Sequence, residues 1–334
     1  MRTSFSDLFA RGLSASLEKD AEFESKHPRA EDGKFGPGFG TPKGPVEVFS
    51  QDQLRKAAKP AKLNEDGTPG KQYYKGVDID LIQHALNFDP KETGLVTMVV
   101  RQDGKRVYQY SDNHKQAKAE KKFAKAIRMV DKIEPLRAKI AKDISSKDEQ
   151  TRASATISKI IDTTFMRIGG GKTEEATGSS GASTLKPKHV TEVEGGLRVN
   201  FLGKSGVAWE RTITDPDIVR NIKEFMRGKG PEDNIFPVNA GQVNRYLKDR
   251  TKGIARGGIT AKDFRTFHAS RIALDQLSKM PAATKKEAKE NIAKAIEFTA
   301  MQLGHTPSVC KSTYVNPIIL EDYLERVALK QEAA

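Results

Sequence analysis

A long amphipathic pattern near the end of the sequence is the strongest constraint on its fold. Ala288, Ile292, Ile296, Thr299 and Leu303 recur every three or four residues among lysines and glutamates. This period matches one face of an α-helix. The pattern therefore predicts a long helix whose apolar face is buried against other elements.

The residues after this pattern predict a turn and a short connection. Gly304 follows the last apolar position, where a left-handed C-cap is least costly, and Pro307 prevents the helix from resuming at once. His305 is then expected at a turn that leaves the core. Tyr314, nine residues later, is expected on or beside a short segment before a last helix that begins after Pro317. Ordinary packing would explain either residue alone, so a catalytic role requires cationic partners elsewhere.

The charge and the cysteine count bound the possible partners. The 334 residues carry a net charge of +13 with a pI near 9.5, which favours a polyanion, and nucleic acid is the leading candidate. The single cysteine, Cys310, excludes an intramolecular disulfide and a thiolate metal site, and fits a reducing compartment. The six histidines show no metal-ligand spacing, so no metal is expected.

Changes of composition along the chain predict a tail and two domains. Residues 1–45 are expected to form a disordered tail, because the stretch 21–45 is rich in glycine, proline and charge and has almost no aliphatic residues. Residues 46–114 are predicted to form a small β-containing lobe. Residues 115–334 are predicted to form a larger, mostly helical domain, which gives an α+β fold overall.

A hairpin is the clearest unit of the smaller lobe. Two β-prone runs, 95–101 and 105–110, are joined through an Asp-Gly pair, which is favoured in tight hairpin turns. In the second run Arg106, Tyr108 and Tyr110 alternate onto one side. Such a face suits contact with phosphates and bases, although a half-exposed strand with ordinary aromatic pairs explains it nearly as well.

The larger domain is predicted to begin with helices. Residues 115–134 show a helical period, Pro135 opens a second helix, and a third helical run carries Arg167 to its end. The GGGKT segment at 169–173 superficially resembles a nucleotide-binding phosphate loop. That loop needs a glycine five residues before its Gly-Lys pair and a preceding strand, whereas Met166 occupies the position and a helix precedes it. No nucleotide cofactor is therefore expected.

Two more cations fall at informative positions. The segment 184–213 is predicted to be β-rich in STLKPKHV, GLRVNF and VAWERTI, with Lys204 at a hairpin tip between two glycines. Further helices are predicted at 216–227, 240–247 and 260–277. Arg265 lies among core residues of the last of these helices. An arginine is costly to bury without an anionic partner, and no acidic neighbour is spaced to supply one, which favours a substrate phosphate.

Arg167, Lys204, Arg265, His305 and Tyr314 together have the chemistry to cut a phosphodiester. Two guanidinium groups can hold its non-bridging oxygens, and the histidine adds a third donor. Nearby positive charge favours the phenolate of a tyrosine, whose ordinary pKa is about 10. The same charge stabilises a pentacoordinate phosphorus. The lysine suits protonation of the departing 5′ oxygen, so the reaction requires no metal.

With these residues in place, the chain resembles the type IB DNA topoisomerases of the compact poxvirus and bacterial kind. The resemblance is carried by MRIGGGKTEEATGSSGASTLKPKHV, VNFLGKSG, KDFRTFHAS and LGHTPSVCKSTYVNPIIL, which cover most of residues 115–320. It implies that Tyr314 attacks a DNA phosphate to form a 3′-phosphotyrosyl link. It also implies that Arg167, Arg265 and His305 stabilise the transition state and that Lys204 is the general acid. Rotation about the uncut strand then relaxes supercoils before the 5′ hydroxyl reverses the reaction.

The resemblance extends more weakly to the smaller lobe. DGKRVYQY looks like the family's N-terminal strand, on which Lys105, Tyr108 and Tyr110 occupy DNA-contacting positions. Val107 stands where the poxvirus enzymes carry a base-contacting glutamine. We therefore expect looser sequence choice than in those enzymes.

Matches near the catalytic arginines are mixed. Lys172 keeps its family match as a DNA-contacting lysine, whereas Gly170 and Thr173 replace a lysine and a tyrosine beside Arg167. Lys262 also matches, in the KDFR motif. The replacements at Gly170 and Thr173 add to the expectation that cleavage-site preference is looser than in the poxvirus enzymes.

Two alternatives remain at this point. A tyrosine recombinase or integrase is related in catalytic fold and shares the histidine-tyrosine separation. Recombinases usually place a histidine three residues before the second arginine, where this chain has Lys262, and His268 lies on the other side of Arg265. A non-catalytic DNA-binding module would explain the charge but not Tyr314.

The resemblance also implies the surroundings in which the protein acts. The expected partner is duplex DNA, held by a monomer that closes as a clamp. No membrane association is expected, because no stretch approaches the roughly twenty consecutive apolar residues of a membrane span. No cofactor is expected, because the phosphate-loop resemblance fails. The expected location is the cytoplasm, at the nucleoid, of a bacterial or virus-infected cell.

Overall fold

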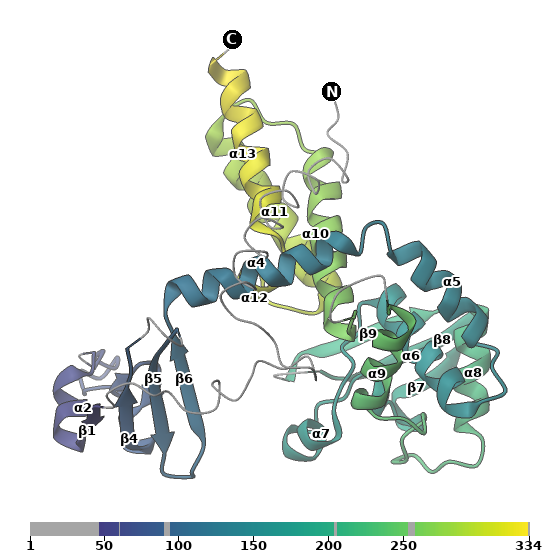
Figure 1. Cartoon of the computed structure of the whole chain (residues 1–334), viewed down its shortest axis with the longest axis horizontal. Coiled ribbons are helices and arrows are strands. Elements are labelled where there is room, and N and C mark those ends of the chain that lie inside the picture. Colours follow the sequence, from purple (N-terminus) through teal and green to yellow (C-terminus); the bar gives the residue numbers. More distant parts are fainter. Residues whose placement is uncertain (1–46, 60, 90–93, 204–205, 253–257, 333–334) are drawn as a thin grey trace. The chain divides into compact units, whose positions relative to one another are not determined.

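The computed structural model describes residues 47–59, 61–89, 94–203, 206–252 and 258–332 (Figure 1). The predicted tail at 1–45 lies outside this range. The chain divides into two compact units, and the division falls within helix α4 (Asp112–Arg128), between Lys121 and Lys122. Strands and helices occur in both units, so the predicted α+β class is confirmed.

The unit that precedes Lys122 contains an antiparallel sheet in the order β1-β4-β5-β6. Leu54 of helix α2 is fully buried with Tyr74, Ile82 and Val99, because alternate side chains of the strands face this helix. The elements are β1 (Glu47–Phe49), α2 (Gln51–Ala57), β2 (Tyr73–Tyr74), β3 (Val77–Asp78), η1 (Ile79–Leu81), β4 (Ile82–Asn87), β5 (Leu95–Arg101) and β6 (Arg106–Tyr110).

The hairpin predicted from the Asp-Gly pair is confirmed. Strands β5 and β6 are antiparallel with Val99 opposite Val107, and Gly104 at the turn has φ +75°. A left-handed backbone of this kind is accessible to glycine at little cost.

The unit from Lys122 onward is mostly helical, with one three-stranded antiparallel sheet in the order β7-β8-β9 (Figure 1). Its helices are α5 (Ile133–Asp143), α6 (Glu149–Thr164), α7 (Gly171–Thr177), α8 (Pro216–Met226), α9 (Ala240–Arg250), α10 (Ala261–Ser278), α11 (Lys285–Leu303), α12 (Pro307–Thr313) and α13 (Pro317–Glu332). Its other elements are η2 (Ala182–Thr184), η3 (Pro187–His189), β7 (Val190–Val193), β8 (Gly196–Leu202) and β9 (Ala208–Ile213).

Helix α10 lies between two hydrophobic cores of this unit. Phe264 and Phe267 belong to a core shared with α5, α6, α8, α9 and the sheet, whereas Ala269 and Ala273 belong to a core shared with α11, α12 and α13. Arg265 therefore lies on α10 where the two cores meet. Both cores hold the backbone of α10 fixed, which is what a precisely placed guanidinium requires.

Two predictions about local structure are wrong. The third helix ends at Thr164, because Phe165 adopts a left-handed conformation with φ +59°, so Arg167 follows the helix in a segment without regular secondary structure. STLKPKHV forms two short 3₁₀ turns, with Pro187 opening the second, before β7 begins at Val190. Proline has a fixed φ and no N–H, which suits the start of a helical turn better than a paired strand.

Candidate active site

A close approach of two chain segments holds Arg167. The Arg167 carbonyl accepts a hydrogen bond from the Ala182 amide at 2.8 Å, and the Ile168 carbonyl accepts one from the Ser183 amide at 2.7 Å. A Cβ on Gly181 would lie 2.4 Å from the Gly169 nitrogen and 2.6 Å from the Arg167 carbonyl oxygen. Only glycine allows this approach, which gives a physical reason for the GSSGAS stretch.

Arg265 is buried, with 3% of its surface exposed, and its guanidinium is held by main-chain oxygens. Its Nη1 donates to the Phe165 carbonyl, and its Nη2 donates to the Leu303 carbonyl at 2.7 Å. Its Nε has no hydrogen-bond partner. Among the residues that the structure describes, no carboxylate pairs with Arg265, as the sequence suggested. Burial lowers the pKa of Arg265 to about 10, against an opposing effect of Tyr314.

His305 stands between the two arginines. Gly304 ends helix α11 with φ +64°, as predicted, and the His305 amide donates to the Ala300 carbonyl at 2.9 Å. The Arg167 Nη2 lies 2.9 Å from Nδ1 of the ring, and the Arg265 Nη2 lies 2.5 Å from Nε2. A neutral imidazole has one acceptor nitrogen, so it accepts from one guanidinium at a time.

Tyr314 packs against both His305 and Arg265. The tyrosine and histidine rings stack with centroids 4.6 Å apart, and the Arg265 guanidinium lies 5.4 Å from the tyrosine ring centroid. The Tyr314 amide donates to the Cys310 carbonyl at 2.9 Å, and 7% of its surface is exposed. The expected short connection is a helix, α12, and Tyr314 is its C-cap residue.

A small pocket of about 20 Å³ adjoins the two arginines. Its walls come from α10, the end of α11, the Arg167 segment and the hairpin of β8 and β9; they are Arg167, Ser180, Phe201, Gly203, Val207, Trp209, Arg265, Leu303 and Gly304. The Gly203 amide donates to the Val207 carbonyl at 2.8 Å at the hairpin end. Lys204, which follows Gly203 in the chain, lies outside the described residues. The structure therefore brings together four of the five predicted catalytic residues and describes the neighbour of the fifth.

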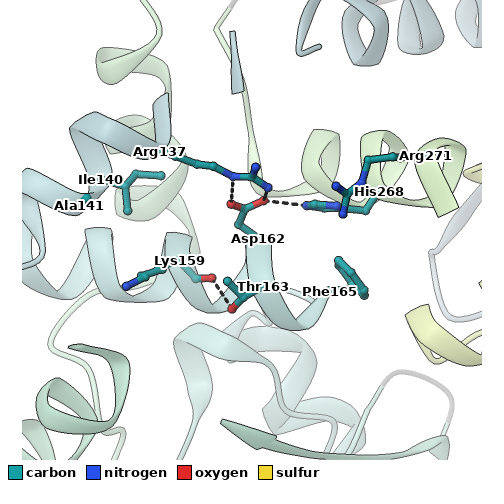
Figure 2. Close-up of a pocket in the computed structure, with 9 residues that line it drawn as sticks. All are labelled: Arg137, Ile140, Ala141, Lys159, Asp162, Thr163, Phe165, His268 and Arg271. Carbon is teal, nitrogen blue, oxygen red and sulfur yellow. Dashed lines mark hydrogen bonds and ion pairs between the residues drawn. The ribbon is translucent and has the colours of Figure 1, made fainter. Parts of the chain in front are cut away.

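Sequence reasoning missed a charged network formed by Arg137, Asp162 and His268 (Figure 2). The Asp162 carboxylate accepts from the Arg137 Nε at 2.7 Å and lies 2.7 Å from Nε2 of His268, as the dashed lines in Figure 2 show. The ring centroids of Phe165 and His268 are 4.7 Å apart. The Phe165 carbonyl accepts a hydrogen bond from Arg265, so the network supports Arg265 indirectly, through Phe165.

Burial and hydrogen bonding have opposite effects on the pKa values of Asp162 and His268. Burial alone would raise the pKa of Asp162, but the hydrogen bonds from His268 and Arg137 outweigh it and leave that pKa lowered. Burial lowers the pKa of His268, against the opposing effect of Asp162. Asp162 is therefore ionised and His268 neutral near pH 7. A pocket of about 410 Å³ opens beside the network, between Arg137, Lys159, Phe165 and Arg271 (Figure 2).

The predicted DNA-contacting residues are distributed over both units. Lys105 and Tyr108 are exposed on the hairpin, where the Tyr108 and Tyr110 rings are 6.5 Å apart. Lys262 is exposed in the first turn of α10. The backbone of Lys172 belongs to α7, whereas its side chain is outside what the structure describes.

The described ranges contain neither a candidate metal cluster nor a candidate membrane-spanning helix. No cluster of three or more His, Cys, Asp or Glu side chains that could bind a metal occurs there. No helix within those ranges has the length and hydropathy needed to cross a membrane.

The mostly helical unit thus gathers two arginines, a histidine and a tyrosine at one point. A family model described as the catalytic core of eukaryotic DNA topoisomerase I matches residues 111–333. The chain therefore belongs to this family, the type IB DNA topoisomerases, and the predicted resemblance is confirmed.

Named relatives agree with this assignment. The chain is 29% identical over 237 residues to "DNA topoisomerase 1B" of Acanthamoeba polyphaga mimivirus, which covers 66% of this chain and 69% of that protein. It is 28% identical over 217 residues to "DNA topoisomerase 1" of Daucus carota, covering 62% of this chain and 27% of the relative. It is 29% identical over 209 residues to "DNA topoisomerase 1" of Homo sapiens, covering 59% and 27%. The match to the plant and human relatives thus spans about a quarter of their length.

Proposed function

We propose that this protein relaxes supercoiled duplex DNA by cutting one strand, letting it rotate and resealing it, without ATP or metal. The observation that carries the proposal is the position of Tyr314, which packs against His305 and under the Arg265 guanidinium, while Arg167 reaches the same histidine. A tyrosine beside two guanidinium groups is equipped to attack a phosphodiester.

In the proposed reaction the Tyr314 hydroxyl oxygen attacks the phosphorus and the bond to the 5′ oxygen breaks. The phenol loses its proton, the phosphate stays on Tyr314 as a 3′-phosphotyrosyl ester, and the 5′ oxygen leaves as a hydroxyl. The reverse attack by that hydroxyl restores the strand. The energy of the phosphodiester is kept in the ester, which is why no nucleotide is consumed.

Arg167, Arg265 and His305 are the proposed transition-state stabilisers. The Arg167 guanidinium lies beside Nδ1 of the His305 ring, and the Arg265 guanidinium lies beside Nε2 of the same ring. Arg265 is already desolvated and fixed by two carbonyls, so little reorganisation accompanies the growth of negative charge on the phosphate oxygens. Such preorganised donors contribute most when water is excluded.

Lys204 is the proposed general acid that protonates the departing 5′ oxygen. The support is its sequence position, directly after Gly203, which lines the same pocket as Arg167 and Arg265. A lysine near two arginines is expected to release its proton more readily than an isolated lysine.

The proposed substrate is duplex DNA, held between the predicted lobes at 46–114 and 115–334 by a monomer that closes as a clamp. Lys105, Tyr108, Tyr110, Lys172 and Lys262 are the proposed DNA contacts. We further propose action at the nucleoid, in the cytoplasm of a bacterial or virus-infected cell. The recombinase alternative is not favoured, because both the matched family and the named relatives are topoisomerases.

The direct test is relaxation of supercoiled plasmid in a chelator and without ATP. We expect the wild-type protein to relax the plasmid and Tyr314→Phe to bind DNA with no relaxation. The Phe ring keeps the stacking on His305 and removes only the hydroxyl. Relaxation by Tyr314→Phe at the wild-type rate would overturn the proposal, and strand exchange without relaxation would favour the recombinase.

A further inference from the structure

Lys122 is attached to the chain segment that carries Tyr314. Its Nζ donates to the Thr313 carbonyl at 2.6 Å, and this carbonyl belongs to the peptide group that links Thr313 to Tyr314. The N–H of the same peptide group donates to the Cys310 carbonyl at 2.9 Å. Both ends of the peptide group before the proposed nucleophile are therefore fixed, one of them by a lysine from helix α4.

The surroundings of Lys122 show that α4 faces the first turn of α10. Lys125, one turn along α4, forms an ion pair of 2.6 Å with Asp263. Asp263 also accepts from the amide and hydroxyl of Thr260, at 2.8 Å and 2.7 Å, and so caps α10. Lys262 is the residue next to Asp263. Lys122 and Lys262 therefore lie within one helical turn of the two ends of this ion pair, Lys122 on α4 and Lys262 on α10.

The electrostatics of Lys122 indicate a place for an anion. Its side chain is half-buried, with Nζ 4.1 Å from the Phe123 ring centroid. Burial, and secondly the charge of Lys262, lower the pKa of Lys122 to about 8. An ammonium has three donors, and the Thr313 carbonyl uses one of them. Lys262 has no ion pair among the described residues. An anion between the two ammonium groups would relieve their repulsion and use their remaining donors.

We propose that Lys122 and Lys262 bind a DNA backbone phosphate that adjoins the one under attack, and that Lys122 thereby couples DNA binding to the placement of Tyr314. This inference rests on the proposed function, since it names a further phosphate contact of the same site. Lys122 is a positioning residue: it touches the substrate backbone and the Thr313 carbonyl, and it takes no part in bond making. When DNA is bound, the ammonium bridges the phosphate and the peptide group before Tyr314.

Non-covalent binding gives the first test. In a Tyr314→Phe background, which cannot react, the affinity for a duplex oligonucleotide is measured from low to moderate salt. Each phosphate contact contributes about 0.9 to the slope of log affinity against log salt. Lys122→Gln should make the slope shallower by about that amount, and Lys122→Arg should restore it. Lys289→Gln is the matched control, because Lys289 is exposed near the opposite end of α11 from His305 and loses the same charge.

Single-turnover cleavage at saturating DNA gives the second test, with Tyr314 intact. Lys122→Gln should cleave on the order of tenfold more slowly even when all enzyme is bound, because a misplaced nucleophile slows a positioned reaction. Lys122→Arg should recover most of the rate. Thermal unfolding of each variant confirms that it is folded, and the Lys289→Gln variant should match the wild type in all three measurements.

The outcomes separate the inference from the proposed function. A changed cleavage rate with an unchanged salt slope would make Lys122 a structural tether only and would overturn the phosphate contact. An unchanged rate and slope would overturn the whole inference. The salt slope is measured in the Tyr314→Phe background, in which no reaction occurs. A wild-type protein that forms no covalent adduct would contradict the proposed function, and the salt slope would still test the phosphate contact of Lys122.

Discussion

Arg265 combines a structural role with a proposed chemical one. Its guanidinium satisfies the carbonyls of Phe165 and Leu303 from two different segments and also reaches His305. Its position on α10, between two cores, fixes where these segments meet. A buried cation that binds only neutral groups is unusual, because an unpaired buried charge is costly. We expect a bound phosphate to offset the free-energy cost of burying the Arg265 charge.

Arg265→Lys tests this role at the residue scale. A lysine keeps the charge but cannot span two carbonyls and a histidine with fixed geometry, so we expect the cleavage rate to fall about 100-fold or more. Stability should fall by about 1–3 kcal/mol for each carbonyl that loses its donor. Single-turnover cleavage and denaturant unfolding measure the two effects. Arg271→Lys, on the exposed side of the same helix, serves as control and should change neither by much.

The Asp162 carboxylate links pH to stability. Its pKa in the folded protein lies below the ordinary 3.8, and the pKa of His268 lies below the ordinary 6.5. Both groups therefore bind fewer protons in the folded state than in the unfolded state at acid pH. The free energy of unfolding therefore falls as the pH drops below about 6.5, and falls further as the pH drops below about 3.8.

Asp162→Asn should remove the carboxylate part of this dependence. It removes one of the two carboxylate partners of Arg137, which is 34% exposed and keeps its ion pair with Glu134 at 2.6 Å, so we expect a loss of about 1–3 kcal/mol near pH 7 and a flatter stability profile below pH 4. Urea unfolding at several pH values measures both. Asp275→Asn changes an exposed aspartate of α10 and should leave the profile unchanged. Equal profiles for the Asp162 variant and the wild type would contradict the assigned shift.

At the scale of elements, the Arg167 segment depends on two facing glycines. Gly169 has φ +81°, and Gly181 packs against its backbone without space for a Cβ. Gly181→Ala should displace the segment and lower the cleavage rate at least tenfold, since small misplacements of a catalytic group are costly. Gly171→Ala is the matched control, because a Cβ there meets nothing within 4 Å and alanine favours the helix α7. Similar rates for both variants would show that the close approach is unimportant.

Elements with a clear period were predictable from the sequence, and those shaped by distant contacts were not. The apolar spacing before Gly304 located helix α11, and the Asp-Gly pair located the hairpin of β5 and β6. Phe165 has a left-handed backbone that a sequence pattern does not signal, because the residue is not glycine. The carbonyl that it offers to Arg265 explains why this conformation is needed.

The candidate site was predictable as a set of residue types, but its supports were not. Arg167, Arg265, His305 and Tyr314 were recognisable because phosphodiester chemistry requires cations near a nucleophile, and family motifs surround them. Asp162 and His268 are 106 residues apart in the chain, so no local pattern indicates their contact. Lys122 is 191 residues from the carbonyl that it binds, and in the sequence it is one lysine in a lysine-rich helix.

At the scale of the whole molecule, the chain consists of two compact units that share helix α4. Lys118 of this helix lies 5.9 Å from the ring centroid of Tyr110 in the first unit, and Lys122 binds the Thr313 carbonyl in the second. The same helix therefore has contacts with a proposed DNA-binding strand and with the proposed nucleophile segment. A net charge of +13 is consistent with both units binding a polyanion.

Tyr314 is the residue proposed to form a covalent bond to the 3′ end of a cut DNA strand. The most direct measurement is to quench a reaction with labelled duplex DNA in denaturant, digest the protein and identify the modified peptide by mass spectrometry. We predict a nucleotide adduct on the peptide that contains Tyr314, sensitive to Arg265→Lys and absent from Tyr314→Phe. An adduct on another residue, or relaxation of plasmid with no adduct at all, would contradict the account.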